Sequence, residues 1–192
     1  MREHDINKLD NFISGYYGNN ISYCDELIEI FKNSDEKEDG IVGTSRVVDR
    51  SIKDSVDLIL TQEIFHEYLE KLLIPAKNEY IKKYPYCNEY NPWIVKEFAN
   101  IQYYKPGGGY HVWHTERSGM QIPCSSRHLV FMTYLNDVTD AGETEWLHQK
   151  IKIKPEKGLT VIWPVDWTFT HRGIVSPTQD KYIVTGWFSF LK

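Results

Sequence analysis

The chain lacks several features that would assign it to a familiar class of protein. No run of about 18 apolar residues occurs in the 192-residue sequence, so we expect no membrane-spanning helix. The charged amino end is not followed by an apolar segment, which is not typical of a signal peptide. The net charge of −5 provides no general attraction for nucleic acids or anionic membranes. We therefore expect neither a nucleic acid nor a membrane as a partner.

Cysteine is also scarce. The three cysteines, Cys24, Cys87 and Cys124, are odd in number, lie far apart and include no CxxC pair. They therefore predict neither a disulfide framework nor a zinc site. Unpaired thiols are typical of a reducing compartment, so we expect the protein in the cytoplasm.

Aromatic residues, in contrast, are abundant, with 13 Tyr, 8 Phe and 6 Trp. Such residues favour β-strands, and we expect most of them to fill a core while a few line a pocket. A chain of 192 residues fits one domain with a sizeable core. The composition therefore favours a single β-rich domain.

The first half of the chain predicts mainly helices. Residues 1–40 are polar and end in a charge run at 33–40, which is typical of a solvated loop. From 54 to 83, apolar residues recur at spacings of three and four, which predicts amphipathic helix. We expect Pro75 to break or restart the helix, which gives two helices that pack outside a sheet. Two prolines and two asparagines then predict a loop at 84–92.

The second half predicts strands. Its short apolar runs are separated by turn signals, which indicates an antiparallel sandwich or barrel. Tight connections are expected at 106–109 and 155–158, where Pro and Gly cluster. We predict one α+β domain, mainly β, with helical support in 1–93 and a β core in 94–192. The expected strands are 94–104, 110–116, 128–135, 150–153, 159–163 and 182–190.

Two residues of the expected strand 110–116 are suited to bind one metal ion. Side chains at positions i and i+2 of a strand point to the same face, so His114 and Glu116 can reach one ion together. His171, further along the chain, would be the third ligand. Two histidines and one carboxylate on one face of an iron leave open positions for a chelating cosubstrate and O2. The HxE motif alone is weak evidence, because it occurs by chance in many proteins.

Ten residues after His171, Lys181 opens an apolar strand. An ammonium group that enters a dry β-core needs an anionic partner, because a buried unpaired charge is costly. A dicarboxylic cosubstrate would supply that partner, with its far carboxylate on Lys181 and its 2-oxo acid end on the metal. The alternative is that Lys181 lies in water at the entrance of the strand.

Residues 101–187 resemble the 2-oxoglutarate/Fe(II) oxygenases of the prolyl 4-hydroxylase type. Each matching segment is weak by itself, but several segments in the order of the family are strong evidence together. In chain order, these segments are the Tyr/Pro-Gly stretch 102–110, His114-Thr-Glu116 in place of HxD, Arg127 with Tyr134-Leu-Asn-Asp137, Ala141-Gly-Glu-Thr144, the stretch 154–163, His171 and Lys181-Tyr182.

The resemblance implies a double-stranded β-helix, or jelly roll, with the helices packed on its major sheet. It also implies that 2-oxoglutarate is decarboxylated oxidatively to succinate with O2, while a prolyl or similar residue in a protein or peptide is hydroxylated. Ascorbate is the expected reductant. By position in the motif, His114, Glu116 and His171 become the iron ligands and catalytic residues, and Lys181 becomes the cosubstrate anchor.

The remaining cosubstrate contacts are expected around Lys181. Tyr104 and Tyr134 match tyrosines that hydrogen-bond the cosubstrate in this family. Tyr103 would replace Tyr104 if the strand register shifted by one residue, because such a shift reverses the faces. Thr185 and Trp187 lie on the Lys181 face of the last strand by its period of two, and would line the same pocket.

The sequence departs from the family pattern at two places. Glu116 stands where the family usually has Asp, and its side chain is longer by one methylene group. Other oxygenases of the wider superfamily use Glu here, so we interpret the change as a variation. The segment between Tyr110 and His114 is one residue longer than usual, which predicts a bulge.

Three alternatives remain open. The substrate could be a free amino acid or small metabolite, because loops such as 84–92 and 120–126 determine it. The chain could be a non-enzymatic β-sandwich binding module, which would lack metal affinity. It could also be a cupin-type metal enzyme, which would have no use for Lys181. Arg127 and Arg172 are further candidates for substrate contact.

Overall fold

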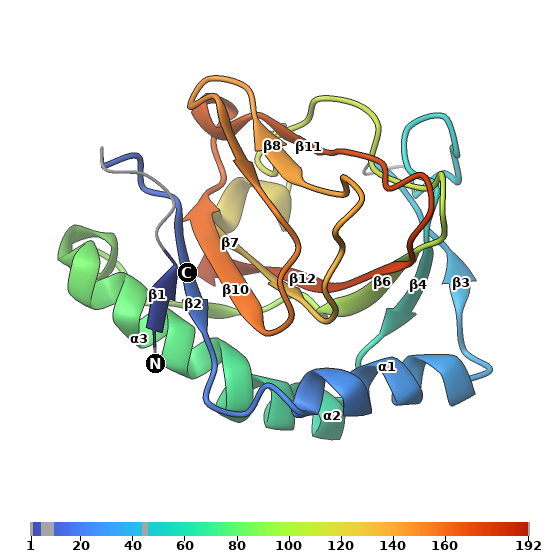
Figure 1. Cartoon of the computed structure of the whole chain (residues 1–192). Coiled ribbons are helices and arrows are strands. Elements are labelled where there is room, and N and C mark those ends of the chain that lie inside the picture. Colours follow the sequence, from blue (N-terminus) through green and yellow to red (C-terminus); the bar gives the residue numbers. More distant parts are fainter. Residues whose placement is uncertain (1, 5–9, 44–45, 192) are drawn as a thin grey trace.

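Two antiparallel β-sheets face each other in the computed structural model, which describes residues 2–4, 10–43 and 46–191 (Figure 1). The larger sheet has nine strands in the order β1-β2-β10-β7-β12-β6-β4-β3, and β5 pairs with β12. The smaller sheet has the order β11-β8-β9. This architecture confirms the predicted double-stranded β-helix. The strands are β1 (Arg2–His4), β2 (Ser14–Tyr17), β3 (Glu38–Asp39), β4 (Val56–Ile59), β5 (Trp93–Val95), β6 (Asn100–Tyr104), β7 (Arg127–Tyr134), β8 (Thr144–Trp146), β9 (Ile151–Ile153), β10 (Leu159–Pro164), β11 (His171–Gly173) and β12 (Lys181–Phe190).

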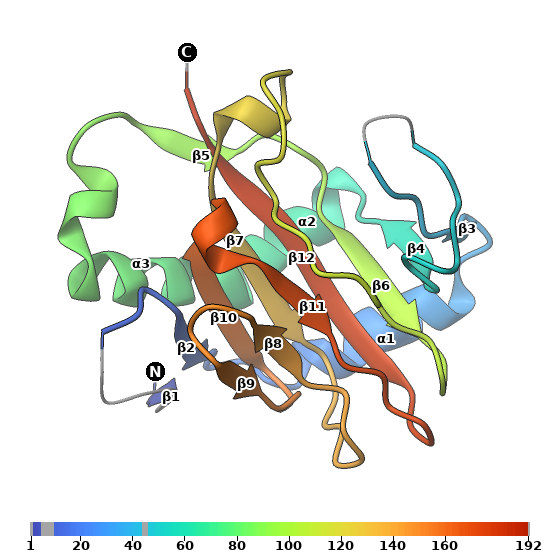
Figure 2. The same cartoon turned by 90° about the horizontal axis from the view of Figure 1, so that it is seen from above.

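Strand β12 separates two cores. It lies between β7 and β6 in the larger sheet, as Figure 2 shows from above. Because successive side chains of a strand point to opposite faces, Tyr182 and Val184 pack on the helix side, whereas Ile183 packs between the two sheets. Lys181 and Thr185 share the face of Ile183 and line a cavity there. The space between the sheets is therefore partly core and partly cavity.

The helical segment between β4 and β5 is continuous rather than broken at Pro75. The amide of Ile74 donates to the carbonyl of Leu69, five residues back, which widens the helix next to the proline. A proline lacks the amide that an α-helix needs and clashes with the preceding turn, and the wider turn accommodates both effects. Two α-helices are present as predicted, and Pro75 stands in the first turn of the second, but the helical path is not interrupted between them. The parts of the segment are α2 (Gln62–Tyr68), a π-helical turn (Leu69–Leu73) and α3 (Ile74–Lys83).

These helices and α1 (Tyr23–Asn33) lie along the outer face of the larger sheet (Figure 1). One apolar core joins the helices to the sheet, and its members include Leu27, Phe31, Leu72, Leu73, Ala76 and Tyr80 from the helical side and Ile101, Phe131, Val184 and Phe188 from the strands. The helices thus cover the face of the sheet that does not form the cavity. None of the described helices is long and apolar enough to cross a membrane.

The first half of the chain contains more β-structure than we predicted. Strand β4 occupies the start of the segment 54–83, and the helix begins only after Thr61, whose hydroxyl accepts a hydrogen bond from the Ile64 amide. Helix α1 was missed because its apolar residues are embedded in polar sequence. The expected strand 110–116 is not formed either, since Tyr110 and His114 make only isolated bridges.

Candidate active site

His114 and His171 are held opposite each other by their own backbones. The His114 amide donates to the His171 carbonyl oxygen at 3.0 Å, and the His171 amide donates to the His114 carbonyl oxygen at 2.9 Å. Residues paired in this way on antiparallel segments present their side chains on the same face. The two imidazole rings accordingly lie with their centroids 4.3 Å apart. The isolated bridge between His114 and His171 therefore places the His114 side chain at the site, which we had expected the strand 110–116 to do.

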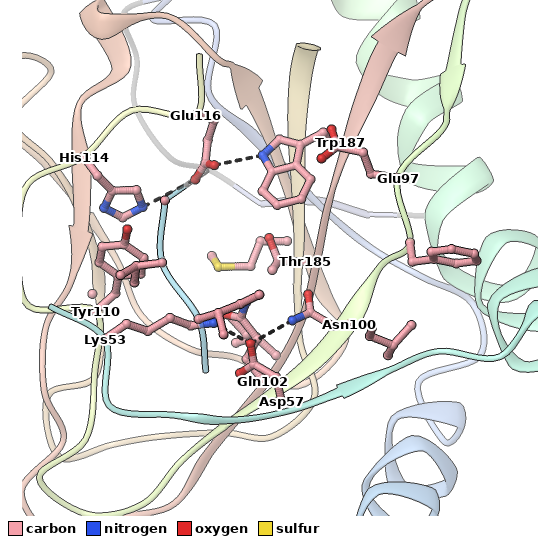
Figure 3. A pocket seen from close by; sticks show the side chains of 18 of the residues that line it. Lys53, Asp57, Glu97, Asn100, Gln102, Tyr110, His114, Glu116, Thr185 and Trp187 are labelled. Carbon is pink, nitrogen blue, oxygen red and sulfur yellow. Dashed lines mark hydrogen bonds and ion pairs between the residues drawn. The ribbon is translucent and has the colours of Figure 1, made fainter. Parts of the chain in front are cut away.

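Glu116 lies beside His114 (Figure 3) and completes a compact set of three donor groups with His114 and His171. Its Oε1 lies 3.4 Å from His114 Nε2 and 3.4 Å from His171 Nε2, and the three groups offer ligand atoms that all lie within 4.8 Å of one another. Each histidine turns its other ring nitrogen, Nδ1, to a backbone carbonyl, of Val112 at 3.1 Å and of Phe169 at 2.9 Å. Since these Nδ1 atoms donate, the Nε2 lone pairs remain free for a metal. The donor set fits Fe(II), which two histidines and one carboxylate bind.

The protonation states also suit a metal site. Burial would by itself raise the pKa of the Glu116 carboxyl, but its contacts with His114 and His171 hold this pKa well below its usual range. Burial and the charge of His114 lower the pKa of His171. The carboxylate is thus ionised and the buried imidazole favours its neutral form, as metal coordination requires.

The second carboxylate oxygen of Glu116 is restrained by the protein. The Trp187 indole N–H donates to Glu116 Oε2 at 2.9 Å. The Arg127 guanidinium lies 3.5 Å from the centroid of that indole ring and also donates to the Glu116 backbone carbonyl at 2.9 Å. Glu97 pairs with Arg127 through both of its oxygens, at 2.8 and 2.5 Å. These contacts fix the longer carboxylate with Oε1 turned toward the histidines.

A cavity of about 1390 Å³ extends from this triad between the two sheets. Ligand pockets typically measure about 300–1,000 Å³, so the cavity has room for a small dicarboxylate and part of a larger substrate. Its lining includes the triad, Lys181, Tyr104, Thr185 and Trp187. Strands β6 and β12 form one wall, and residues of the segment 35–43 together with Arg46 contribute to the rim.

Lys181 lies inside this cavity and is only 5% exposed, which contradicts the alternative that it lies in water. Its Nζ donates to the Gly142 carbonyl at 3.1 Å and lies 5.0 Å from the centroid of the Tyr104 ring. No carboxylate among the described residues lies within ion-pair distance of it, although Glu143 acts on it over a longer range. Burial lowers the pKa of Lys181 to about 8. An ammonium group in this position lacks an anionic partner.

The two predicted tyrosines lie in different surroundings. Tyr104 faces the cavity and its hydroxyl donates to Gln102 Oε1 at 2.7 Å. Tyr103 points to the other face, where its hydroxyl donates to Asp180 at 2.8 Å. Tyr134 is fully buried beyond the cavity lining, and its hydroxyl donates to Thr144 Oγ1 at 2.7 Å. Of the three, Tyr104 alone is placed to meet a ligand directly.

Several cavity residues were missed by the sequence analysis. Lys53 and Asp57 are four residues apart, which resembles a helical ion pair, yet both line the cavity, Asp57 from strand β4 and Lys53 from the segment before it. Asn100 and Gln102 also line it, and their alternation with Tyr104 along one strand was the signal that could have identified them. The charge run 33–40 was expected to be a solvated loop, but most of it lies at the rim and includes β3.

Arg127 and Arg172 were candidates for substrate contact. Arg127 instead pairs with Glu97, as described above. Arg172 pairs with Glu145 at 3.1 Å and lies 4.4 Å from the centroid of the Trp113 ring. Both guanidinium groups therefore have carboxylate partners within the protein.

The model of the 2OG-Fe(II) oxygenase superfamily matches residues 99–189 of this chain. No curated protein matches the chain. Among solved structures, a viral collagen prolyl hydroxylase from Paramecium Bursaria Chlorella virus-1, in its 2OG complex, is 20% identical with a TM-score of 0.68, covering 94% of this chain and 97% of that one.

Two further structures are similar in fold. A Pseudomonas putida prolyl-4-hydroxylase is 15% identical with a TM-score of 0.68, and the match covers 94% of each chain. A Trichoplax adhaerens prolyl hydroxylase, in complex with a hypoxia inducible factor oxygen degradation domain peptide fragment, is 14% identical with a TM-score of 0.74 and covers 94% of this chain and 84% of that one. The family match extends from β6 to β12 and so includes the triad and Lys181, and the three solved structures share the fold of this chain.

Proposed function

We propose that this protein is an Fe(II)- and 2-oxoglutarate-dependent dioxygenase that hydroxylates a prolyl or similar residue in a protein or peptide. The observation that carries this proposal is that one cavity contains two groups suited to the two ends of the same ligand. One is a triad of two imidazoles and one carboxylate, and the other is the buried ammonium of Lys181, which has no carboxylate partner among the described residues. A dicarboxylate with a 2-oxo acid end has the chemistry to bind both.

The residues of the chain would divide the work as follows. His114, Glu116 through Oε1, and His171 would hold Fe(II), which supplies the redox chemistry that activates O2. Lys181 would bind the far carboxylate of 2-oxoglutarate, above the ring of Tyr104. The overall reaction converts 2-oxoglutarate, O2 and a C–H bond into succinate, CO2 and a C–OH group.

The other predicted cosubstrate residues would act at different distances. Thr185 lines the cavity between the two ends, although its hydroxyl now donates to the Phe131 carbonyl at 3.2 Å. Trp187 would position Glu116 rather than touch the cosubstrate, because its N–H is already bound to Oε2. Tyr134 would act through Thr144, which lines the cavity and accepts its hydrogen bond.

A peptide or protein substrate is favoured over a free metabolite by two observations. The cavity is larger than a small dicarboxylate requires, and its rim includes exposed apolar side chains such as Phe98 and Ile122. The structurally similar Trichoplax adhaerens enzyme was solved with a peptide fragment bound. We propose further that all 192 residues work as one domain, in the reducing cytoplasm that suits the free thiols of Cys24, Cys87 and Cys124.

The direct test is to incubate the protein aerobically with Fe(II), ascorbate and 2-oxoglutarate and to measure succinate by mass spectrometry. We expect slow succinate release without a substrate and faster release with a prolyl peptide. Protein treated with a chelator is the control. If the protein binds neither Fe(II) nor 2-oxoglutarate, the binding-module alternative is correct.

A further inference from the structure

The cavity wall opposite Glu116 carries polar side chains that metal and cosubstrate binding do not use. Lys53, Asp57, Asn100 and Gln102 lie together there, and Thr185 lies between them and the triad (Figure 3). Lys53 is 4% exposed and Gln102 is 9% exposed, so both are inside the protein. Burying such groups is costly unless each finds a partner. The hydrogen-bond partners of these side chains therefore show which of their polar groups are left for a ligand.

Asp57 neutralises this wall. Its Oδ2 accepts hydrogen bonds from Lys53 Nζ at 2.5 Å and from Asn100 Nδ2 at 3.0 Å. Its Oδ1 accepts a hydrogen bond from the Ser55 hydroxyl at 2.7 Å. The carboxylate is thus compensated by one cation and by two neutral donors. The wall has polar groups but no net charge to offer a ligand.

Two hydrogen-bonding groups are left over on this wall. A carboxylate only accepts, so Asn100 must turn its amide nitrogen to Asp57, and its Oδ1 has no donor among the described residues. The Tyr104 hydroxyl donates a hydrogen bond to Gln102 Oε1. Gln102 Nε2 therefore remains as a donor, and it has no acceptor among the described residues. The two side chains lie two residues apart on β6, and hence on one face. Together they offer one acceptor and one donor.

The charge balance of the cavity limits what can fill this place. Lys53, Arg127 and Arg172 each contact a carboxylate of the protein. Of the rim cations, Arg46 is exposed to solvent, and Lys37 is half-buried with its Nζ donating to the Lys32 carbonyl at 2.9 Å. Inside the described cavity only Lys181 remains without a carboxylate, and the cosubstrate would use it. A second anionic group would therefore meet no free cation next to β6.

We propose that Asn100 and Gln102 bind a neutral amide of the substrate, namely the peptide group on the carboxyl side of the target residue. The carbonyl of that group accepts from Gln102 Nε2, and its N–H donates to Asn100 Oδ1. A proline has no amide hydrogen of its own, so of the two peptide groups that flank a target proline only the one that follows it can fill both positions. This inference rests on the proposed function and adds a specificity site that selects internal residues over a free amino acid.

Three small probes separate the possible ligands. They are N-acetyl-alanyl-proline as its N-methylamide, its methyl ester and its free acid. Their dissociation constants are measured by NMR titration on protein loaded with Mn(II) and 2-oxoglutarate without O2, so that no turnover occurs. We expect the N-methylamide to bind about tenfold more tightly than the ester, which lacks the N–H and leaves Asn100 Oδ1 unpaired. The free acid is expected to bind at least as weakly as the ester.

Variants assign this preference to the wall. Gln102→Met removes the donor, and Gln102→Glu removes it while keeping an acceptor for Tyr104. In both variants we expect the N-methylamide to lose about tenfold in affinity, with the affinity for 2-oxoglutarate within about twofold of wild type. Asn100→Leu should abolish the difference between amide and ester. Gln121→Met, at the exposed rim of the same cavity, is the matched control.

Each other outcome overturns the inference. Equal binding of the amide and the ester by the wild type would show that Asn100 does not accept a hydrogen bond from the N–H. A loss of 2-oxoglutarate affinity in Gln102→Met, with peptide binding unchanged, would assign Gln102 to the cosubstrate. No binding of any probe to protein that has bound Mn(II) and 2-oxoglutarate would also exclude the site. Failure to bind Mn(II) and 2-oxoglutarate at all would instead refute the proposed function.

Discussion

The two ends of the cavity differ in how far the protein satisfies the charges that it buries. At the metal end, Glu116 is in contact with both histidines and with Trp187, and Arg127, which is paired with Glu97, lies against the Trp187 ring. At the other end, the ammonium group of Lys181 donates to one backbone carbonyl and has no described carboxylate partner. The contacts within the protein fix the side chains at the metal end without a ligand, whereas Lys181 at the other end needs an anion to pair with.

This contrast suggests why glutamate can stand at position 116. A longer carboxylate has one more rotatable bond and loses more conformational freedom when it binds a metal. The hydrogen bond from Trp187 and the guanidinium of Arg127 above the indole restrict that freedom before any metal arrives. The extra methylene group is therefore offset by neighbouring residues rather than by a change in the histidines.

The largest effect is expected when a metal ligand is removed. His171→Ala deletes one of three donors and leaves Glu116 with a single imidazole neighbour, so we expect the affinity for Mn(II) or Fe(II) to fall by more than about 100-fold. Calorimetry under anaerobic conditions measures this. His148→Ala is the control, because His148 is exposed and does not line the cavity. Unchanged metal affinity in His171→Ala would exclude His171 as a ligand.

The next largest effect is expected at the Lys181 end of the cavity. Losing one partner of a desolvated charge pair typically costs about 2–5 kcal/mol, so Lys181→Ala should raise the 2-oxoglutarate concentration needed for half-maximal succinate release about thirtyfold or more. Lys181→Arg keeps the charge and should be milder, although its fork reaches differently. Metal affinity should stay close to wild type in both. A Lys181→Ala curve that matches wild type would mean that the anion binds elsewhere.

A smaller effect is expected when the support of Glu116 at the metal end of the cavity is weakened. Trp187→Phe keeps a ring beneath Arg127 and removes the N–H, and loss of such a supporting contact typically lowers metal affinity by about 10–100-fold. In the double variant with Glu116→Asp, the shorter carboxylate no longer reaches the indole, so the second substitution should add little. Mn(II) calorimetry on the four proteins measures the coupling, with Trp167→Phe at an exposed position as control. Fully additive losses would mean that Trp187 does not position Glu116.

The sequence allowed some of this to be predicted. The strand positions of β7, β10 and β12 follow from apolar runs bounded by turns, and the alternation along β12 correctly put Lys181, Thr185 and Trp187 on one face. The positions of the triad residues were predicted from motif spacing, even though the strand expected to carry His114 is only a bridge. Local pattern was sufficient where a residue and its function lie on the same element.

Contacts between distant segments could not be predicted in this way. The ion pair of Lys53 and Asp57 lies beside strand β4, a four-residue element whose pairing with β6 determines its conformation more than its own propensity does. The continuity of the helix past Pro75 depends on a π-helical turn that no composition signal announces. The contact of Arg127 with Trp187 joins β7 and β12, and only the folded sheet shows it.

The last prediction uses pH to change the protonation state of Lys181. Burial lowers the pKa of Lys181 to about 8, so the ammonium form predominates at pH 7 and the neutral amine at pH 9. Only the ammonium form pairs with the carboxylate, and 2-oxoglutarate remains a dianion throughout. The dissociation constant should therefore rise with pH, by about tenfold between pH 7 and pH 9. Lys181→Arg stays charged over this range and should give a flat profile. Anaerobic titration of Mn(II)-loaded protein measures both curves, and a flat profile in the wild type would show that Lys181 keeps its proton without the ligand.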